Sequence, residues 1–126
     1  MASDTRGGDE PALAALRALV AALDTCSDEL GSARERAQRL VEQRETGRPW
    51  LDIVTAEPRP LVVERISTVL ATLATAGSAW RREQARALHG ESVSINRIAS
   101  LFGVTRQRIS ALLRDRPDDD AAPAID

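Results

Sequence analysis

The sequence contains no lysine and no tyrosine, only one cysteine and one histidine, and three aromatic residues in 126. The single Cys26 excludes an internal disulfide. Cys26 and the lone His89 also lack companions at metal-ligand spacing. We therefore expect no metal and no cofactor in this chain.

Long hydrophobic runs are also absent. No apolar stretch reaches about 18 residues, so we expect no transmembrane helix. The first ten residues are polar and lack the apolar core of a signal peptide, so we expect a cytoplasmic protein. The sequence further lacks a glycine-rich phosphate loop, a His–Cys–Asp constellation and paired carboxylates on an apolar face, so we expect a protein that is not an enzyme.

The stretch 94–114 is the most informative part of the sequence. Its first half carries apolar residues at three- and four-residue spacing, which lie on one face of a helix. Ser94 is a favourable N-cap for that helix, and Gly103 suits the left-handed backbone that commonly follows a helix end. The sequence therefore predicts a short helix that ends in a tight turn. Its apolar residues are Ile95, Ile98, Ala99 and Phe102.

A second short helix is predicted directly after this turn. Thr105 is a favourable N-cap, and Val104 with Ile109 can pack around it as a hydrophobic staple. Ile109, Leu112 and Leu113 supply the apolar face of this helix. Ala99 is small enough to let two helices that cross after a short turn approach closely.

The spacing of Ala99, Gly103, Ile109 and Leu112 resembles the core of the bacterial helix-turn-helix DNA-binding domain, over about a sixth of the chain. In that family the second helix enters the major groove, and its early residues contact base edges. The resemblance implies base contacts by Thr105, Arg106, Gln107, Ser110 and Ala111. It implies contacts to the phosphate backbone by Asn96, Arg97, Arg108 and Arg114.

These residue types suit DNA. An arginine can donate two hydrogen bonds to guanine and a glutamine can pair with adenine, and each pairing is worth about 1–3 kcal/mol of discrimination. The free backbone N–H groups at the start of the second helix can meet a phosphate. The alternative is that these polar residues are only the solvated face of a helical bundle. A bundle does not require the observed spacing of Ala99, Gly103, Ile109 and Leu112, so the spacing favours DNA binding.

The net charge is −2, but the charges are segregated along the chain. Residues 78–116 hold eight arginines against three acidic residues, a balance of +5. Residues 1–77 hold nine arginines against twelve acidic residues, a balance of −3, and residues 117–126 add four aspartates. Because the local field attracts phosphate, the basic segment is the expected DNA-binding part.

An apolar seam with alternating four- and three-residue spacing runs through residues 11–47, which is typical of a coiled coil. Two interpretations remain open: one long helix that pairs with another chain, or a helical hairpin broken near residues 24–28, where the residue types favour caps over helix interiors. The stripe must be buried in either case, and we expect it to form a homodimer. The seam comprises Ala12, Leu16, Leu19, Leu23, Cys26, Leu30, Ala33, Ala37 and Leu40. The expected dimer interface is Leu16, Leu19, Leu23, Leu30, Ala37 and Leu40.

The sequence therefore predicts an all-α protein in five parts. A disordered start (1–10) precedes the pairing element (11–47), and a connector with a core helix that stops at 76–78 follows (48–77). A three-helix helix-turn-helix domain without a wing (78–116) begins with a support helix that is capped by Ser78 and contributes Trp80, Ala87 and Leu88. A disordered acidic tail (117–126) either competes with phosphate or only aids solubility.

These features predict a sequence-specific, homodimeric DNA-binding transcriptional regulator. Two alternatives remain. One is an adaptor whose N-terminal helices bind another regulator or a polymerase component, with the C-terminal helices as a packing scaffold. The other is a nucleoid-associated protein with little sequence preference.

Overall fold

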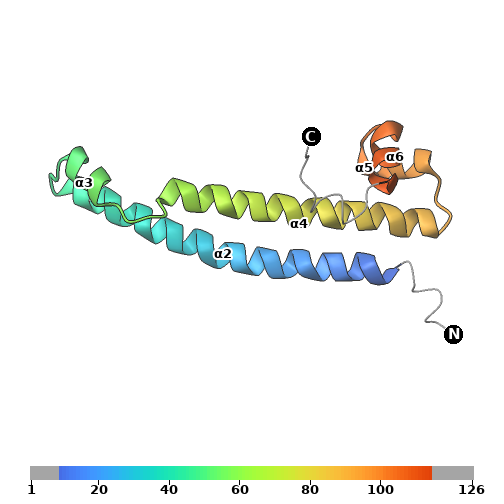
Figure 1. Cartoon of the computed structure of the whole chain (residues 1–126), viewed down its shortest axis with the longest axis horizontal. Coiled ribbons are helices and arrows are strands. Elements are labelled where there is room, and N and C mark those ends of the chain that lie inside the picture. The colour runs from blue at the N-terminus through green and yellow to red at the C-terminus, as the bar shows by residue number, and fades with distance from the viewer. Residues whose placement is uncertain (1–8, 115–126) are drawn as a thin grey trace, which may run out of the picture. The chain divides into compact units, whose positions relative to one another are not determined.

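The structure is a computed structural model that describes residues 9–114, and this part of the chain is built from helices without any strand. The all-α prediction is therefore confirmed for these residues. No helix among them is long and apolar enough to cross a membrane. The helices are α2 (Asp9–Glu45), α3 (Trp50–Ala56), α4 (Val62–Gly90), α5 (Ile95–Phe102) and α6 (Arg106–Arg114) (Figure 1).

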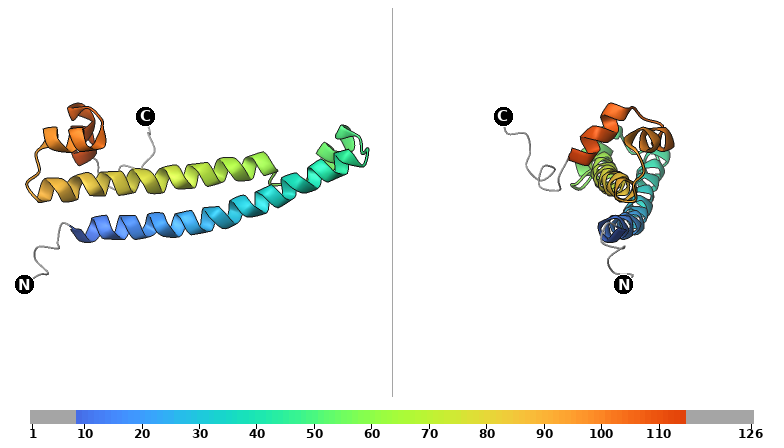
Figure 2. Two further views of the ribbon diagram at one scale, coloured as in Figure 1. Left: turned by 180° about the vertical axis from the view of Figure 1, so that it is seen from behind. Right: turned by 90° about the vertical axis from the view of Figure 1, so that its right-hand side faces the viewer.

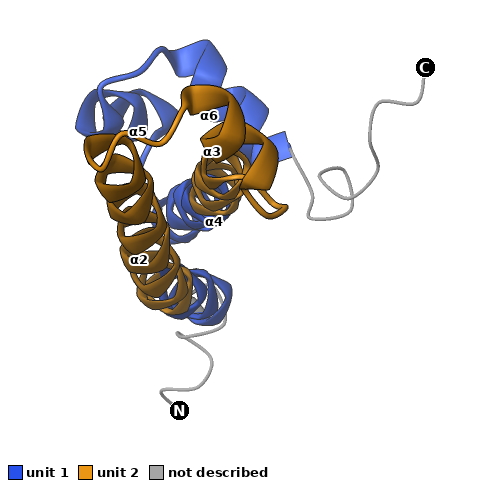
Figure 3. Cartoon of the chain, turned by 90° about the vertical axis from the view of Figure 1, so that its left-hand side faces the viewer, with its two compact units in different colours: residues 1–19, 76–126 blue, residues 20–75 orange. Residues whose placement is uncertain are grey.

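The chain divides into two compact units (Figure 3). One unit is formed by residues 20–75 and contains most of α2, all of α3 and the first half of α4. The other joins residues 1–19 to residues 76–126, and its described part holds the first turns of α2, the second half of α4, and α5 with α6. We call them the hairpin unit and the terminal unit.

A single helix, α2, spans the predicted seam, so the hairpin alternative for residues 11–47 is excluded. Thr25, Ser27 and Gly31 lie inside it without breaking it. Each of these residues costs a helix at most about 1 kcal/mol, and the burial of Cys26 and Ala33 on the same helix opposes that cost. The helix also includes Asp9 and Glu10, which corrects the prediction that residues 1–10 are disordered; residues 1–8 and the predicted tail at 117–126 lie outside the described residues.

In the hairpin unit, α2 and α4 run antiparallel side by side (Figures 1 and 2). The buried thiol of Cys26 donates a long hydrogen bond to the carbonyl oxygen of Val69, with 3.9 Å from sulfur to oxygen. Further along, the guanidinium of Arg65 donates to the hydroxyl of Ser32 at 3.3 Å. These two pairs show which turns of α2 and α4 face each other.

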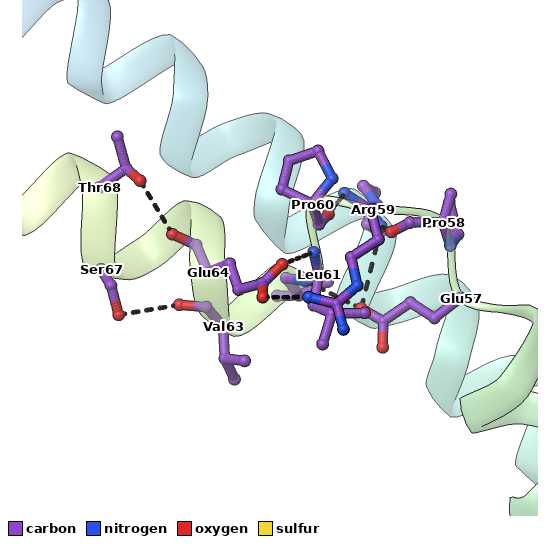
Figure 4. A network of polar contacts seen from close by, with 11 residues as sticks. Glu57, Pro58, Arg59, Pro60, Leu61, Val63, Glu64, Ser67 and Thr68 are labelled. Atoms are coloured by element: carbon purple, nitrogen blue, oxygen red, sulfur yellow. Dashed lines mark hydrogen bonds and ion pairs between the residues drawn. The ribbon is translucent and has the colours of Figure 1, made fainter.

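Two carboxylates accept hydrogen bonds from the backbone where the connector between α3 and α4 meets the start of α4 (Figure 4). The backbone N–H of Val62 donates to the carboxylate of Glu57 at 2.8 Å, and the N–H of Leu61 donates to the carboxylate of Glu64 at 2.7 Å. Both N–H groups belong to the start of α4, where no helical carbonyl is available to accept from them. The helix therefore begins at Val62.

Arg36 joins this connector to α2. Its guanidinium donates to the carbonyl oxygens of Pro58 and Pro60 at 2.9 and 2.8 Å. It also lies 3.8 Å from the carboxylate of Glu57. The carbonyl groups of a connector without regular structure lack the hydrogen-bond donors that a helix provides, and Arg36 donates to two of them.

The helix α4 continues through Ala76, Gly77 and Ser78, where the sequence predicted a stop and a new helix. The prediction was wrong because one glycine and one serine cost only about 1–1.5 kcal/mol together in a helix interior. The flanking segments are rich in alanine and leucine, which favour the helix. The helix ends at Gly90.

The core of the terminal unit is a small apolar cluster formed by α4, α5 and α6. Ile98 and Ile109 have no exposed surface, and neither does Ala85 of α4. Ala99 and Leu112 complete the buried set. Partly buried residues pack around it: Leu88, Val93, Ile95, Phe102 and Leu113. In the same unit the first turns of α2 lie alongside α4, and Ala12 is buried (Figures 1 and 2).

Candidate nucleic-acid interface

The candidate site is built on the turn between α5 and α6. Ser94 caps α5, because its hydroxyl accepts from the N–H of Arg97 at 3.1 Å. Gly103 follows the helix with φ of 69° and ψ of 33°, the left-handed conformation that the sequence predicted there. The N–H of Val104 then donates to the carbonyl of Ala99 at 3.0 Å. This pattern closes α5 and turns the chain sharply towards α6.

The start of α6 is fixed in the same way. The hydroxyl of Thr105 accepts from the N–H of Arg108 at 3.1 Å, as expected for an N-cap. The N–H groups of Arg106 and Gln107 belong to the first turn of the helix and have no helical carbonyl to bond. The helix therefore presents two backbone donors beside polar side chains, at the end where its dipole favours an anion.

The burial of Ile109 and Leu112 fixes which side of α6 faces outward. Gln107, Ala111 and Arg114 lie on the opposite side of the helix from this buried pair. All nine predicted DNA-contacting residues keep exposed surface. Asn96, Arg97, Thr105, Arg106, Gln107, Arg108 and Arg114 are exposed, and Ser110 and Ala111 are half-buried.

The arginines of residues 78–116 differ in how much charge they present. Arg82 is buried at 6% exposure, and Arg86 forms an ion pair with Glu83 at 2.8 Å. Arg116 lies outside the described residues. The exposed positive charge therefore comes from Arg81, Arg97, Arg106, Arg108 and Arg114, against the exposed Glu91. A surface with this balance attracts phosphate.

Two features of this site were missed by sequence reasoning. The guanidinium of Arg81 lies over the ring of Phe102, with its central carbon 4.1 Å from the ring centroid. Since the two residues are far apart in the sequence, no local pattern could have indicated this cation–π contact. The second feature is Ala85, which is the residue of α4 that is fully buried in the apolar cluster of this unit. Trp80 is only half-buried, and Leu88 packs on the cluster as expected.

The predicted dimer residues fall on two adjacent stripes of α2. Leu19 and Leu40 are half-buried and lie in register with the buried Ala12, Cys26 and Ala33, which recur every seven residues. Leu16, Leu23 and Leu30 are exposed, and Ala37, half-buried, continues their stripe at the same spacing. The chain itself therefore uses one half of the predicted seam, and the other half is left open to solvent.

Comparison of the chain with protein-family models, curated proteins and solved structures found no match. The assignment of function therefore depends on the geometry and chemistry of the site.

Proposed function

We propose that this protein is a sequence-specific DNA-binding transcriptional regulator. It acts as a homodimer, and each copy places α6 in the major groove as the recognition helix of a helix-turn-helix domain. In this proposal Thr105, Arg106 and Gln107 contact base edges, with Ser110 and Ala111 further along the same helix. Asn96, Arg97, Arg108 and Arg114 contact the phosphate backbone.

One observation carries this proposal. The turn at Gly103 and the buried Ile98 and Ile109 hold α6 with Gln107 and Arg114 facing outward. A helix that is held by its apolar side and presents arginine and glutamine on the opposite side can enter a major groove about 12 Å wide. A packing scaffold has no need for this outward pair. The exposed arginines add a sequence-independent attraction to the phosphates.

The test is selection of bound sequences from a random pool of duplex DNA at physiological salt. A homodimeric reader selects a palindrome whose half-sites lie about one helical turn, ~34–36 Å, apart. A nucleoid-associated protein retains DNA without enriching a motif. An adaptor retains no DNA, and that result would reject the proposed function.

Substitution of Arg106 tests how the sequence is read. Arg106→Ala removes two possible hydrogen bonds to a guanine, so we expect a loss of about 1–3 kcal/mol that is confined to one base step of each half-site. Arg39→Ala is the matched control, because Arg39 is an exposed arginine of α2 in the hairpin unit and lies on the opposite side of the helix from Leu23 and Leu30. Binding of the selected site and of single-base variants by both proteins gives the comparison. A uniform loss over all sites would assign Arg106 to the phosphates instead.

A further inference from the structure

We propose that a second copy of this chain packs on one side of the hairpin unit, where α2 and α4 together present an open apolar face. The proposal deepens the homodimer of the proposed function and does not depend on DNA binding. It moves the centre of the dimer interface from the predicted seam of α2 to α4. The exposed residues of this apolar face are Val20, Leu23, Leu30 and Val41 from α2 and Val63, Ile66 and Leu70 from α4.

The two stripes lie on the same side of the unit. In α2 the exposed Leu30 follows the buried Cys26 by four positions, and in α4 the exposed Leu70 follows the buried Val69 by one. At about 100° per residue, a residue one position after a buried residue lies about 100° around the helix from it, and a residue four positions after lies about 40° around it in the same direction. Because α2 and α4 run antiparallel, the same sense of rotation brings both stripes to one side of the pair.

The charges of the two helices differ sharply in this unit. No charged residue occurs between Ile66 and Trp80. Every exposed residue of α4 from Ile66 to Thr75 is uncharged: Ile66, Ser67, Thr68, Leu70, Ala71, Thr72, Ala74 and Thr75. The part of α2 in this unit carries nine exposed charged residues, of which Arg34 lies on the same side of the helix as Leu30: Asp24, Asp28, Glu29, Arg34, Glu35, Arg39, Glu42, Arg44 and Glu45. A helix face that stays in water normally carries charges, as α2 does.

Two of the four hydroxyl groups on this part of α4 are already bonded within the helix. Ser67 donates to the carbonyl of Val63, and Thr68 donates to the carbonyl of Glu64, both at 3.1 Å (Figure 4). These hydroxyls therefore need no water and can be covered at little cost. The next turns of α4 carry the small residues Ala71 and Ala74, which let another helix approach closely.

A second copy fits this surface better than an unrelated protein. In a two-fold symmetric contact, residues near the axis meet their own counterparts, so a charged residue there would face the same charge. The uncharged stretch of α4 meets this requirement over its whole length. An interface with a different protein has no such restriction and typically uses opposite charges to select its partner.

Leu70 is the residue to change, because 59% of its surface is exposed in the single chain. An aspartate at this position is tolerated by an isolated copy but faces another aspartate across the two-fold contact. We expect Leu70→Asp to weaken dimerisation by about 30-fold or more. Leu51→Asp is the matched control, because Leu51 belongs to α3, which contributes no residue to the apolar face, and is 72% exposed. Sedimentation at micromolar concentration separates monomer from dimer.

The expected result is a dimer for the wild type and for L51D, and a monomer of equal helix content for L70D. A monomeric wild type, or an L70D protein that stays dimeric, overturns the proposal. Disulfide trapping covers the case in which L70D does not fold. With the native thiol removed by Cys26→Ala, the substitutions Ile66→Cys, Leu70→Cys and Ala74→Cys are each expected to give covalent dimers under mild oxidation if the α4 helices pack parallel. If they pack antiparallel, we expect a covalent dimer from one of the three. Leu51→Cys should give none, and trapping at none of the three positions overturns the proposal.

These measurements contain no DNA. A dimer that binds no DNA therefore rejects the proposed DNA binding and leaves this interface standing. A monomer that selects a DNA motif rejects the homodimer with this interface and leaves the proposed DNA binding standing.

Discussion

Glycine has opposite effects on the stability of the fold at Gly103 and at Gly31. Gly103 has a positive φ of 69°, which costs a residue with a Cβ about 1–2 kcal/mol. Gly31 lies within the helix α2, and a Cβ built there has no neighbouring atom within 4 Å. Glycine therefore suits the turn after α5 and weakens the helix at position 31.

We expect opposite changes in stability from the same substitution at these two sites. Gly31→Ala should raise the free energy of unfolding by about 0.5–1 kcal/mol, because alanine reduces the conformational entropy of the unfolded chain. Gly103→Ala should lower it by about 1–2 kcal/mol and displace the start of α6. Denaturant titrations that follow helix content give both values. A stabilising Gly103→Ala would contradict the left-handed turn on which the candidate site depends.

Arg36 is the residue through which α2 holds the connector before α4. Arg36→Ala leaves the carbonyls of Pro58 and Pro60 without this donor and removes the nearby charge from Glu57. We expect a loss of about 1–3 kcal/mol in the free energy of unfolding. The control is Arg39→Ala, an exposed position one turn further along α2, which should change stability by less than about 0.5 kcal/mol. Equal losses in thermal or urea unfolding would mean that the bonds of Arg36 contribute nothing.

At the scale of helices, local signals in the sequence were reliable where a cap or a turn determines the backbone. Ser94, Gly103 and Thr105 each have the role that their residue type predicts. The stop predicted at residues 76–78 failed because the same residue types are tolerated inside a helix that is stabilised on both sides. Glycine and serine are strong signals only where the flanking residues do not favour the helix.

The partner of an apolar stripe could not be deduced from its spacing. The seam of α2 alternates between spacings of four and three, and this pattern is the sum of two stripes that each repeat every seven residues. One stripe contains the buried Cys26 and Ala33, and the other contains the exposed Leu23 and Leu30. A seven-residue period shows that a stripe needs a neighbouring helix, but only the fold shows which neighbour the same chain supplies. Likewise, the sequence indicated which residues of α6 face outward but not the contact between Arg81 and Phe102.

At the scale of the whole molecule, the proposed dimer and the proposed DNA binding together predict how affinity depends on salt concentration. Each copy presents Arg97, Arg108 and Arg114 as expected phosphate contacts. The logarithm of the binding constant falls with the logarithm of salt concentration by about 0.9 per phosphate contact. Three contacts therefore give a slope of about −2.7 for one copy, and six give a slope of about −5.4 for a dimer.

We therefore expect L70D to bind an isolated half-site with about half the salt slope of the wild type on the full palindrome. L51D should match the wild type, because it changes neither the apolar face nor α6. Fluorescence anisotropy over a range of salt concentrations, with the labelled half-site for L70D and the labelled palindrome for the wild type and L51D, gives the slopes. Equal slopes for the wild type and for a monomeric L70D would mean that a single copy makes all the phosphate contacts. The apolar face would then serve assembly away from DNA, since a dimer that contacts DNA through both copies must release more counterions than a monomer does.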